Sequence, residues 1–310
     1  MIKIDLITGL LGAGKTSFIK KYAEYFIKKG ERISIIENDY GAVNVDRMLL
    51  QELEGEKCDI EMIIGDNDYE THTRRFRTKL ISLGMLGYDR VIIEPSGIYD
   101  TDEFFDVLSE EPLNRWYKIE NVIGIIDAKM DRELSSEMEY MLVSQSADCG
   151  LLLFSHKDAG EETIKVTLEK LNAALRKYHC ERSFSRENIL PVEMHKLTEE
   201  ELEQVETCGY ALYDHVKIQL QGKESFESLF FYELKWTKEK AKEVCQILLN
   251  DRSFGKIIRI KGFLQEKEKW WELNATQEKI RLQPIEKGQN AIIVIGEQLK
   301  KEKINKHIYG

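Results

Sequence analysis

The chain has 310 residues, with 42% apolar residues and 45 Lys and Arg against 55 Asp and Glu. This composition is ordinary for a globular protein of one or two domains, and no apolar run approaches the roughly 20 residues that a membrane-spanning helix needs. The net charge of −10 argues against wholesale nucleic-acid binding, because phosphate contacts dominate that affinity. We therefore expect a cytoplasmic protein that binds neither nucleic acid nor membrane.

Short apolar runs alternate with helical patterns over the first two-thirds of the chain, which is typical of an α/β fold with a mostly parallel sheet flanked by helices. Strands are predicted over residues 2–7, 32–37, 60–64, 90–94, 122–127, 151–154 and 189–192. Helices are predicted over 16–29, where Gly30 takes the place of a C-cap, and over 70–83. A further helix begins at Thr198, which has capping-box spacing to Glu201.

The pattern loosens around residue 222, which predicts a nucleotide-binding domain over 1–222 and a second domain over 223–310. The second domain has a strand at 230–235, a helix at 237–249, strands from 256–264 to 291–296, and a closing helix at 297–307. This order predicts a small α+β domain. It carries 18 Lys and Arg against 13 Asp and Glu, so its charge is opposite to that of the first domain.

The motif G-L-L-G-A-G-K-T at residues 9–16 matches the phosphate-binding loop G-x-x-x-x-G-K-[ST] in full, between a predicted strand and a predicted helix. Glycines let backbone N–H groups turn inward around phosphate oxygens, and the helix N-terminus adds a partial positive charge. Lys15 is predicted to reach the outer phosphates and the hydroxyl of Thr16 to hold Mg²⁺. The predicted loop contacts to the nucleotide come from Gly9, Gly12, Ala13, Gly14, Lys15, Thr16 and Ser17.

Two acidic segments follow strands whose carboxyl ends we expect near the phosphates. In E-N-D-Y-G, at residues 37–41, Glu37 is predicted to lie in the outer shell of the metal, and Asp39 to serve the metal and to organise water. Asp46, which follows this segment, is the second candidate for organising water. In E-P-S-G, a carboxylate that ends a buried strand needs partners, so Glu94 is predicted to serve the Mg²⁺ cluster. The backbone of Gly97 is predicted to contact the γ-phosphate. Lys15, Asp39 and Glu94 are the predicted catalytic residues.

The stretch after the predicted strand at 151–154 reads S-H-K-D, where GTPases normally have N-K-x-D. Asp158 is placed to accept from the two N–H groups of guanine, and His156 to stack on the base. Ser155 supplies one hydroxyl in place of an amide fork. GTP is therefore the predicted nucleotide, and ATP remains an alternative.

These motifs, together with I-I-D-A at 125–128, Q-S-A-D at 145–148 and the segments 255–264 and 291–299, resemble the CobW, HypB and UreG family of P-loop GTPases, and its CobW-like members in particular. The resemblance spans nearly the whole chain. It implies a GTPase that helps to deliver a metal or a metal-containing cofactor to a client protein. It also makes a homodimer across the nucleotide plausible.

The chain departs from that family in one place, because CobW-like metal chaperones carry a C-x-C-C motif where residues 65–69 here contain no cysteine. Thiolates select zinc, so transfer of Zn²⁺ through this site is not expected. The alternating Asp66, Asp68, Glu70 and His72 form either an oxygen-rich loop or, as we favour, an acidic helix start. The five scattered cysteines are predicted to be small buried apolar residues.

The leading hypothesis is a Mg²⁺-dependent GTPase with low intrinsic turnover that acts as a switch in maturation or loading of a client metalloprotein or cofactor protein. A nucleotide-controlled scaffold for a cofactor protein such as a corrinoid protein, with little hydrolysis, is the alternative. A small-molecule kinase is the weaker third hypothesis, since the C-terminal motifs fit no substrate lid.

Overall fold

A computed structural model describes residues 1–39, 49–64, 69–95, 101–130, 134–217, 227–277 and 279–309. These residues form two compact units, which we describe separately. The first contains the described residues up to 217 and the second contains those from 227 onward. The predicted domain boundary at residue 222 lies outside the described residues and stays a prediction.

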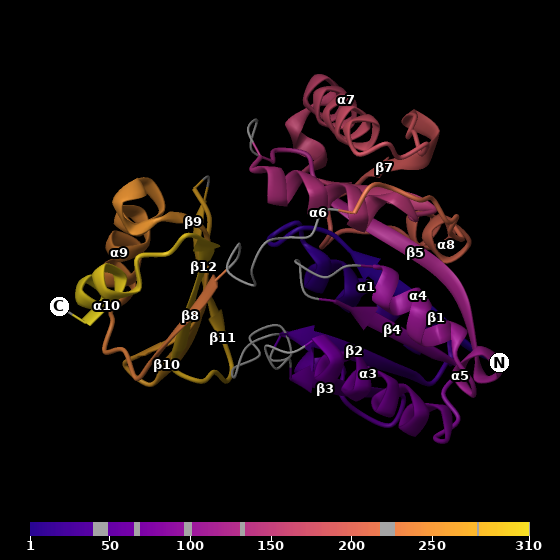
Figure 1. Cartoon of the computed structure of the whole chain (residues 1–310). Coiled ribbons are helices and arrows are strands. Elements are labelled where there is room, and N and C mark those ends of the chain that lie inside the picture. The colour runs from indigo at the N-terminus through magenta and orange to yellow at the C-terminus, as the bar shows by residue number, and fades with distance from the viewer. Residues whose placement is uncertain are drawn as a thin grey trace. The chain divides into compact units, whose positions relative to one another are not determined.

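The first unit contains a seven-stranded sheet in the order β3-β2-β4-β1-β5-β6-β7, and every strand pair among its described residues is parallel. The predicted parallel sheet is thereby confirmed (Figure 1). Because all strands run the same way, their carboxyl ends meet along one edge, where ligands bind in open α/β sheets. The strands are β1 (Ile2–Thr8), β2 (Ile33–Asp39), β3 (Cys58–Ile64), β4 (Arg90–Glu94), β5 (Tyr117–Asp127), β6 (Leu151–Ser155) and β7 (Ile189–Pro191).

Helices cover this sheet on both faces. α1 and α8 share one apolar cluster with side chains from all seven strands or their ends. Side chains such as Leu6 and Ile93 are buried on the opposite face, where the other helices pack against one another. No described helix is long and apolar enough to span a bilayer. The helices are α1 (Lys15–Lys29), α3 (Tyr69–Gly84), α4 (Asp102–Ser109), α5 (Leu113–Trp116), α6 (Ser136–Ala147), α7 (Glu161–Lys177) and α8 (Glu199–Glu206), with short 3₁₀ turns at Gln51–Leu53, Lys157–Ala159 and Arg186–Asn188.

Local capping explains where the predicted helices begin and end. Gly30 ends α1 in the left-handed conformation, with φ of 92°, and its N–H donates to the carbonyl of Ile27. Thr198 and Glu201 form the predicted capping box at α8, since each side chain accepts from the other residue's backbone N–H at 3.2 and 2.9 Å. Both devices satisfy backbone groups that a helix end leaves without partners.

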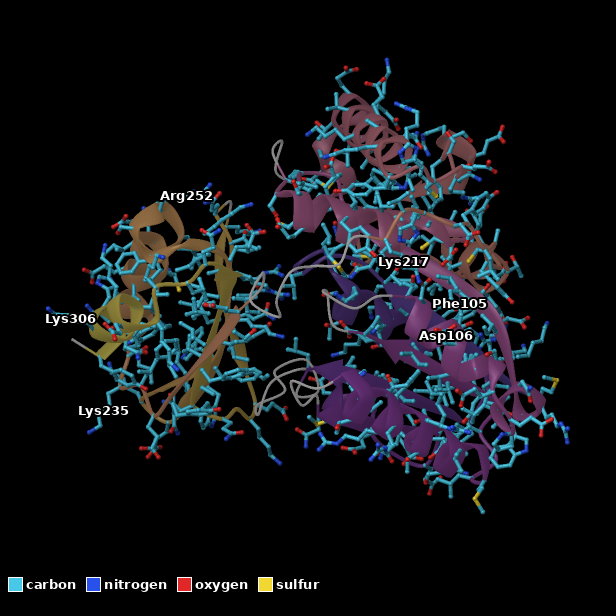
Figure 2. The ribbon with its side chains drawn as sticks, in the orientation of Figure 1. Phe105, Asp106, Lys217, Lys235, Arg252 and Lys306 are labelled. Carbon is cyan, nitrogen blue, oxygen red and sulfur yellow. The ribbon has the colours of Figure 1, made fainter. Side chains whose placement is uncertain are left out.

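The second unit is a five-stranded antiparallel sheet in the order β11-β10-β9-β12-β8, with two helices on one side (Figure 1). Apolar side chains of α9 and α10 pack against that face. Its basic side chains include Lys235, Arg252 and Lys306, which are exposed (Figure 2). The elements are β8 (Glu227–Tyr232), α9 (Lys238–Asn250), the 3₁₀ turn Arg252–Phe254, β9 (Lys256–Glu266), β10 (Lys269–Ala275), β11 (Ile280–Ile285), β12 (Ala291–Glu297) and α10 (Lys301–Tyr309).

Three predicted boundaries are wrong for physical reasons. The strand predicted at 230–235 is β8 at Glu227–Tyr232. It ends there because Glu233 has a φ of 54°, in the left-handed region that β-strands do not adopt. β12 runs on to Glu297, whose carboxylate pairs with Lys256 on β9 at 3.5 Å, so the closing helix begins only at Lys301. β5 begins at Tyr117 rather than at 122, because it pairs with β1 from its first residue onward.

Candidate nucleotide-binding site

The loop between β1 and α1 has the backbone that a phosphate-binding loop requires. Gly9, Gly12 and Gly14 have φ of 140°, 86° and 109°. A Cβ at Gly9 would lie 2.4 Å from the carbonyl oxygen of Ile125, so only glycine lets the loop leave β1 this close to β5. The hydroxyl of Thr8 fixes the strand end by donating to the carbonyl of Gln145, at 2.6 Å, in the Q-S-A-D motif.

Lys15 opens α1 and folds back over this loop. Its Nζ donates to the carbonyl of Gly9 at 2.9 Å, and the residue is 8% exposed. Ala13 is buried in the core below the loop, while Thr16 and Ser17 follow in the first turn of the helix. The predicted loop residues are therefore gathered around one helix N-terminus, where backbone N–H groups and the helix dipole favour an anion.

Thr16 forms a hydrogen bond with Glu94, one of the predicted acidic residues. Its Oγ1 donates to Oε1 of Glu94 at 3.1 Å, and Glu94 is 7% exposed at the end of β4. Glu37 on β2 is in direct register with Glu94 and is 2% exposed. Two buried carboxylates side by side are costly without a cation. A hydroxyl and two carboxylates are hard oxygen donors, so this group of side chains fits Mg²⁺.

The predicted base-reading residues lie at the end of β6, two strands away from β1. Ser155 is buried and its hydroxyl donates to the carbonyl of Ile126 at 3.3 Å, so it serves the sheet and is not directed outward. His156 has a φ of 60° and is half exposed, with Nδ1 3.9 Å from Oδ1 of Asp158. Asp158 is 64% exposed in its side chain, so it is accessible to a base.

Sequence reasoning missed two residues beside these loops. Lys129, in the turn after β5, donates to Oδ2 of Asp158 at 3.0 Å, and this hydrogen bond lowers the pKa of that carboxyl. Met194, in the segment after β7, lies against the loop, because a Cβ at Gly14 would be 3.3 Å from its Cγ. Neither position carries a local sequence signal, since each contact depends on which strands are neighbours.

Several predicted residues lie outside what the structure describes. Asp39 ends β2, but its side chain is not described, and neither Asp46 nor Gly97 is among the described residues. The same holds for Asp66 and Asp68 in the C-x-C-C position. The described part of the chain has no group of three or more His, Cys, Asp and Glu side chains arranged to hold a metal ion.

Burial restricts the chemistry of the five cysteines. Four of the five are buried and Cys208 is half-buried. Burial raises the pKa of Cys58, Cys149 and Cys245 to about 12, so these thiols stay protonated at neutral pH. Since a metal binds the thiolate, these thiols are poor ligands for zinc.

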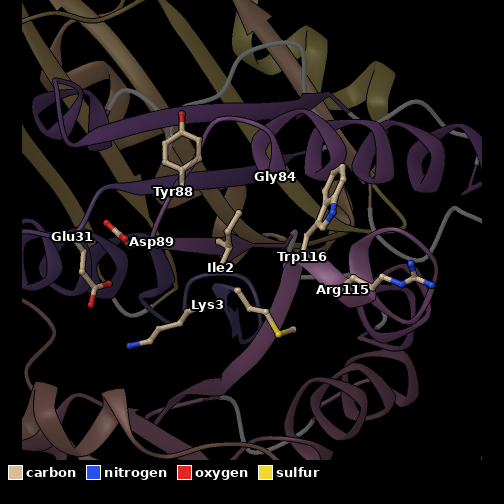
Figure 3. A pocket seen from close by; sticks show the side chains of 9 residues that line it. Ile2, Lys3, Glu31, Gly84, Tyr88, Asp89, Arg115 and Trp116 are labelled. Carbon is tan, nitrogen blue, oxygen red and sulfur yellow. The ribbon is translucent and has the colours of Figure 1, made fainter.

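A hollow of about 590 Å³ opens at the opposite edge of the sheet, next to the amino ends of the strands (Figure 3). Lys3, Glu31, Asp89 and Trp116 line it, and each lies at or just before the start of a strand. The phosphate loop and the acidic residues lie at the carboxyl ends, so this hollow is separate from the nucleotide-binding edge.

Two family models match this chain. Residues 3–186 match the family model of the CobW/HypB/UreG nucleotide-binding domain, and residues 236–309 match the cobalamin synthesis protein cobW C-terminal domain. The chain is 29% identical over 185 residues to the zinc chaperone YjiA of Escherichia coli, which covers 56% of this chain and 55% of that protein. It is 25% identical over 187 residues to the zinc-regulated GTPase metalloprotein activator 1 of Schizosaccharomyces pombe, covering 55% and 44%.

The alignments thus span about half the length of these curated relatives. Among solved structures, the Zn(II)-bound YjiA GTPase from E. coli is 21% identical with a TM-score of 0.41, over 100% of this chain and 98% of that chain. The match to the nucleotide-binding model covers more than half of the residues, and a second model, that of the cobW C-terminal domain, matches the second unit. The chain therefore belongs to the CobW/HypB/UreG family of P-loop GTPases.

Proposed function

We propose that this protein binds and hydrolyses GTP with Mg²⁺ and uses the nucleotide as a switch in the maturation, or the metal or cofactor loading, of a client protein. The observation that carries the proposal is the hydrogen bond of 3.1 Å from Thr16 to Glu94. Thr16 directly follows the phosphate loop, in which Lys15 donates to the carbonyl of Gly9. Groups that can donate to phosphate oxygens and oxygen atoms suited to a hard cation therefore lie side by side at the carboxyl ends of β1 and β4.

The chain's own residues would act mainly by position and charge, as in other phosphoryl transfers. Backbone N–H groups of residues 12–17 bind the phosphates, and the ammonium of Lys15 compensates negative charge on the outer ones. Thr16 and Glu94 would hold the metal, with Glu37 nearby to orient its water ligands. A bound Mg²⁺ neutralises charge on the phosphate oxygens. Asp39 positioning water and Gly97 sensing the γ-phosphate remain predictions on residues whose contacts are not described.

The choice of guanine rests on Asp158. An ionised carboxylate accepts two hydrogen bonds side by side, which matches the two N–H groups of guanine and not the acceptor and donor edge of adenine. The pKa of Asp158 is lowered by the hydrogen bond from Lys129, which favours that ionised form. Use of ATP is the alternative outcome of the experiment below.

The client role is supported by the names of the two relatives, one a zinc chaperone and one a metalloprotein activator. The absence of cysteine from residues 65–69 argues against zinc passing through that position in this chain. We therefore propose that cargo or client binds elsewhere, with a homodimer across the nucleotide as a further expectation. Zinc at one equivalent in protein purified without chelator, measured by elemental analysis, would contradict this part of the proposal.

The test is thermal unfolding with Mg²⁺ and GTP, GDP, ATP or ADP, together with a GTP hydrolysis assay. A nucleotide at a hundred times its dissociation constant stabilises the folded state by about 2.7 kcal/mol, which is a shift of roughly 5–10 °C for a domain of this size. Lys15→Ala should abolish both the shift and hydrolysis. Lys28→Ala removes the same charge from the far end of α1 and should abolish neither.

The outcomes separate the alternatives. Equal shifts with guanine and adenine nucleotides would remove the assignment of GTP. Tight binding of GTP without any product would favour the nucleotide-controlled scaffold over the enzyme. No shift with any nucleotide would refute the whole proposal.

A further inference from the structure

The carboxylate proposed to read the base is held by a lysine from another loop. Nζ of Lys129, in the turn after β5, is 3.0 Å from Oδ2 of Asp158. The lysine of the base-reading loop itself, Lys157, instead approaches Oε1 of Glu201 on α8 at 3.8 Å. Of the described lysines, Lys129 is thus the one that the structure places on Asp158.

The turn that carries Lys129 is firmly anchored. Its backbone N–H donates to Oδ1 of Asp127 at 2.8 Å, in the I-I-D-A motif. The preceding residue, Ala128, forms two further hydrogen bonds. Its N–H donates to the carbonyl of Ser155 at 3.3 Å, and its carbonyl accepts from the buried hydroxyl of Thr167 on α7 at 2.8 Å. The turn is therefore tied to β6 and to α7, and it offers a fixed base for a long side chain.

Asp158 has less support of its own. Its side chain is 64% exposed, and its Oδ1 lies 3.9 Å from Nδ1 of His156, which is too far for a hydrogen bond. A carboxylate this exposed rotates among several orientations, and a ligand that needs one orientation must order it on binding. A hydrogen bond from Lys129 to one oxygen restricts that rotation before the ligand arrives.

We propose that Lys129 is a positioning residue for guanine recognition, which holds the carboxylate of Asp158 in the orientation that accepts the 1-imino and 2-amino groups of the base together. This inference rests on the proposed use of guanine nucleotides and assigns part of that specificity to the turn after β5. Each carboxylate oxygen has two lone pairs, so the bond from Lys129 leaves Asp158 able to accept from the base.

The size of the effect follows from the exposure of the pair. The side chain of Lys129 is 33% exposed and that of Asp158 64%, and exposed ion pairs of this kind change equilibria by up to about fivefold. Lys129→Ala should therefore weaken GDP binding by about three- to fivefold. Lys129→Glu, which sets a like charge against Asp158, should weaken it by at least about tenfold. Lys129→Arg should bind GDP as the wild type does.

The experiment measures dissociation constants of the full chain with Mg²⁺ for GDP, IDP and ADP, where IDP lacks the 2-amino group. Lys129→Ala should reduce the advantage of GDP over IDP and leave ADP unchanged. Lys157→Ala is the matched control, because it removes the same charge one residue from Asp158 without touching that carboxylate. In an Asp158→Ala background, Lys129→Ala should change GDP binding by less than about twofold, since independent effects would instead add.

Two failures are distinguishable. If the wild type binds GDP no more tightly than ADP, the proposed use of guanine nucleotides is wrong. If the wild type prefers GDP but Lys129→Ala behaves like Lys157→Ala, or weakens GDP and ADP equally, the positioning role of Lys129 is refuted while the proposed function stands.

Discussion

Replacement of Gly9 by alanine tests the geometry on which the phosphate loop depends. The new Cβ would lie 2.4 Å from the carbonyl oxygen of Ile125, which is backbone of the neighbouring strand β5 and has little freedom to move. The φ of 140° adds a conformational cost of about 1–2 kcal/mol for a residue with a side chain. Relief of the contact also strains the pairing of β1 with β5, at about 0.5–1.5 kcal/mol per weakened hydrogen bond.

Together these terms predict that Gly9→Ala lowers the free energy of unfolding by about 2–4 kcal/mol, which a domain of ordinary stability survives. Because the carbonyl of Gly9 also accepts from Lys15, nucleotide affinity should fall by at least about tenfold, as expected when binding groups shift by about 1 Å. Urea unfolding and nucleotide titration measure the two effects.

Two glycines serve as controls that separate the causes. Gly87 has a φ of 73° but no atom within 4 Å of its added Cβ, so Gly87→Ala should cost only the conformational term of about 1–2 kcal/mol. Gly55 has open space and no positive φ, so Gly55→Ala should be near neutral. If Gly9→Ala costs no more than Gly87→Ala, the close approach of the loop to β5 is not what restricts this position.

Three further variants probe the charged groups. Glu94→Gln keeps the shape of the side chain but removes a charge from the proposed metal site. The ratio of nucleotide affinity with Mg²⁺ to that with EDTA should therefore fall by at least about tenfold, and an unchanged ratio would exclude a role of Glu94 in holding the metal. Arg90→Met leaves the buried Asp5 without its cation, so the free energy of unfolding in urea should fall by about 3–5 kcal/mol. Adding Asp5→Asn should recover most of this loss, and no recovery would show that lost packing dominates. Although burial opposes its ionisation, hydrogen bonds led by that from Lys29 hold the pKa of Glu206 below its ordinary 4.5. Its stabilisation is therefore present above pH 4.5 and lost as the pH falls through the folded-state pKa, so Glu206→Gln should cost about 1 kcal/mol at pH 7 and nothing in acid; a constant difference across pH would contradict this.

Short-range patterns predicted the parts of the molecule that short-range physics determines. The phosphate loop, the glycine end of α1 and the capping box of α8 each depend on residues within a few positions of one another, and each is found where it was expected. The parallel sheet was predicted from apolar runs that suit strands covered on both faces. The strand ends were harder, because the start of β5 is set by its register with β1 and not by its own polar residues.

The candidate site was predictable to the extent that its residues belong to motifs. Thr16 and Glu94 lie 78 positions apart, and their contact follows from the neighbouring places of β1 and β4 in the sheet. Ser155 was expected to supply one hydroxyl in the base-reading loop, and the structure shows that this hydroxyl donates to the carbonyl of Ile126 on the neighbouring strand. Lys129 was missed altogether, because nothing in its own segment indicates that it reaches Asp158 in the next loop.

The two ends of β4 show how this fold separates stability from function. Arg90 begins the strand with no exposed surface, and its guanidinium pairs with Asp5, contacts Glu31 at 3.1 Å and lies 3.8 Å above the ring of Phe26. Its charge is therefore compensated within the folded chain. Glu94 ends the same strand in register with a second buried carboxylate, that of Glu37, so two hard oxygen donors lie at the carboxyl edge. This carboxyl edge is next to the phosphate loop, where we propose that a nucleotide–Mg²⁺ complex binds. Substitutions at the Arg90 end should accordingly lower stability without changing nucleotide affinity, whereas those at the Glu94 end should do the reverse.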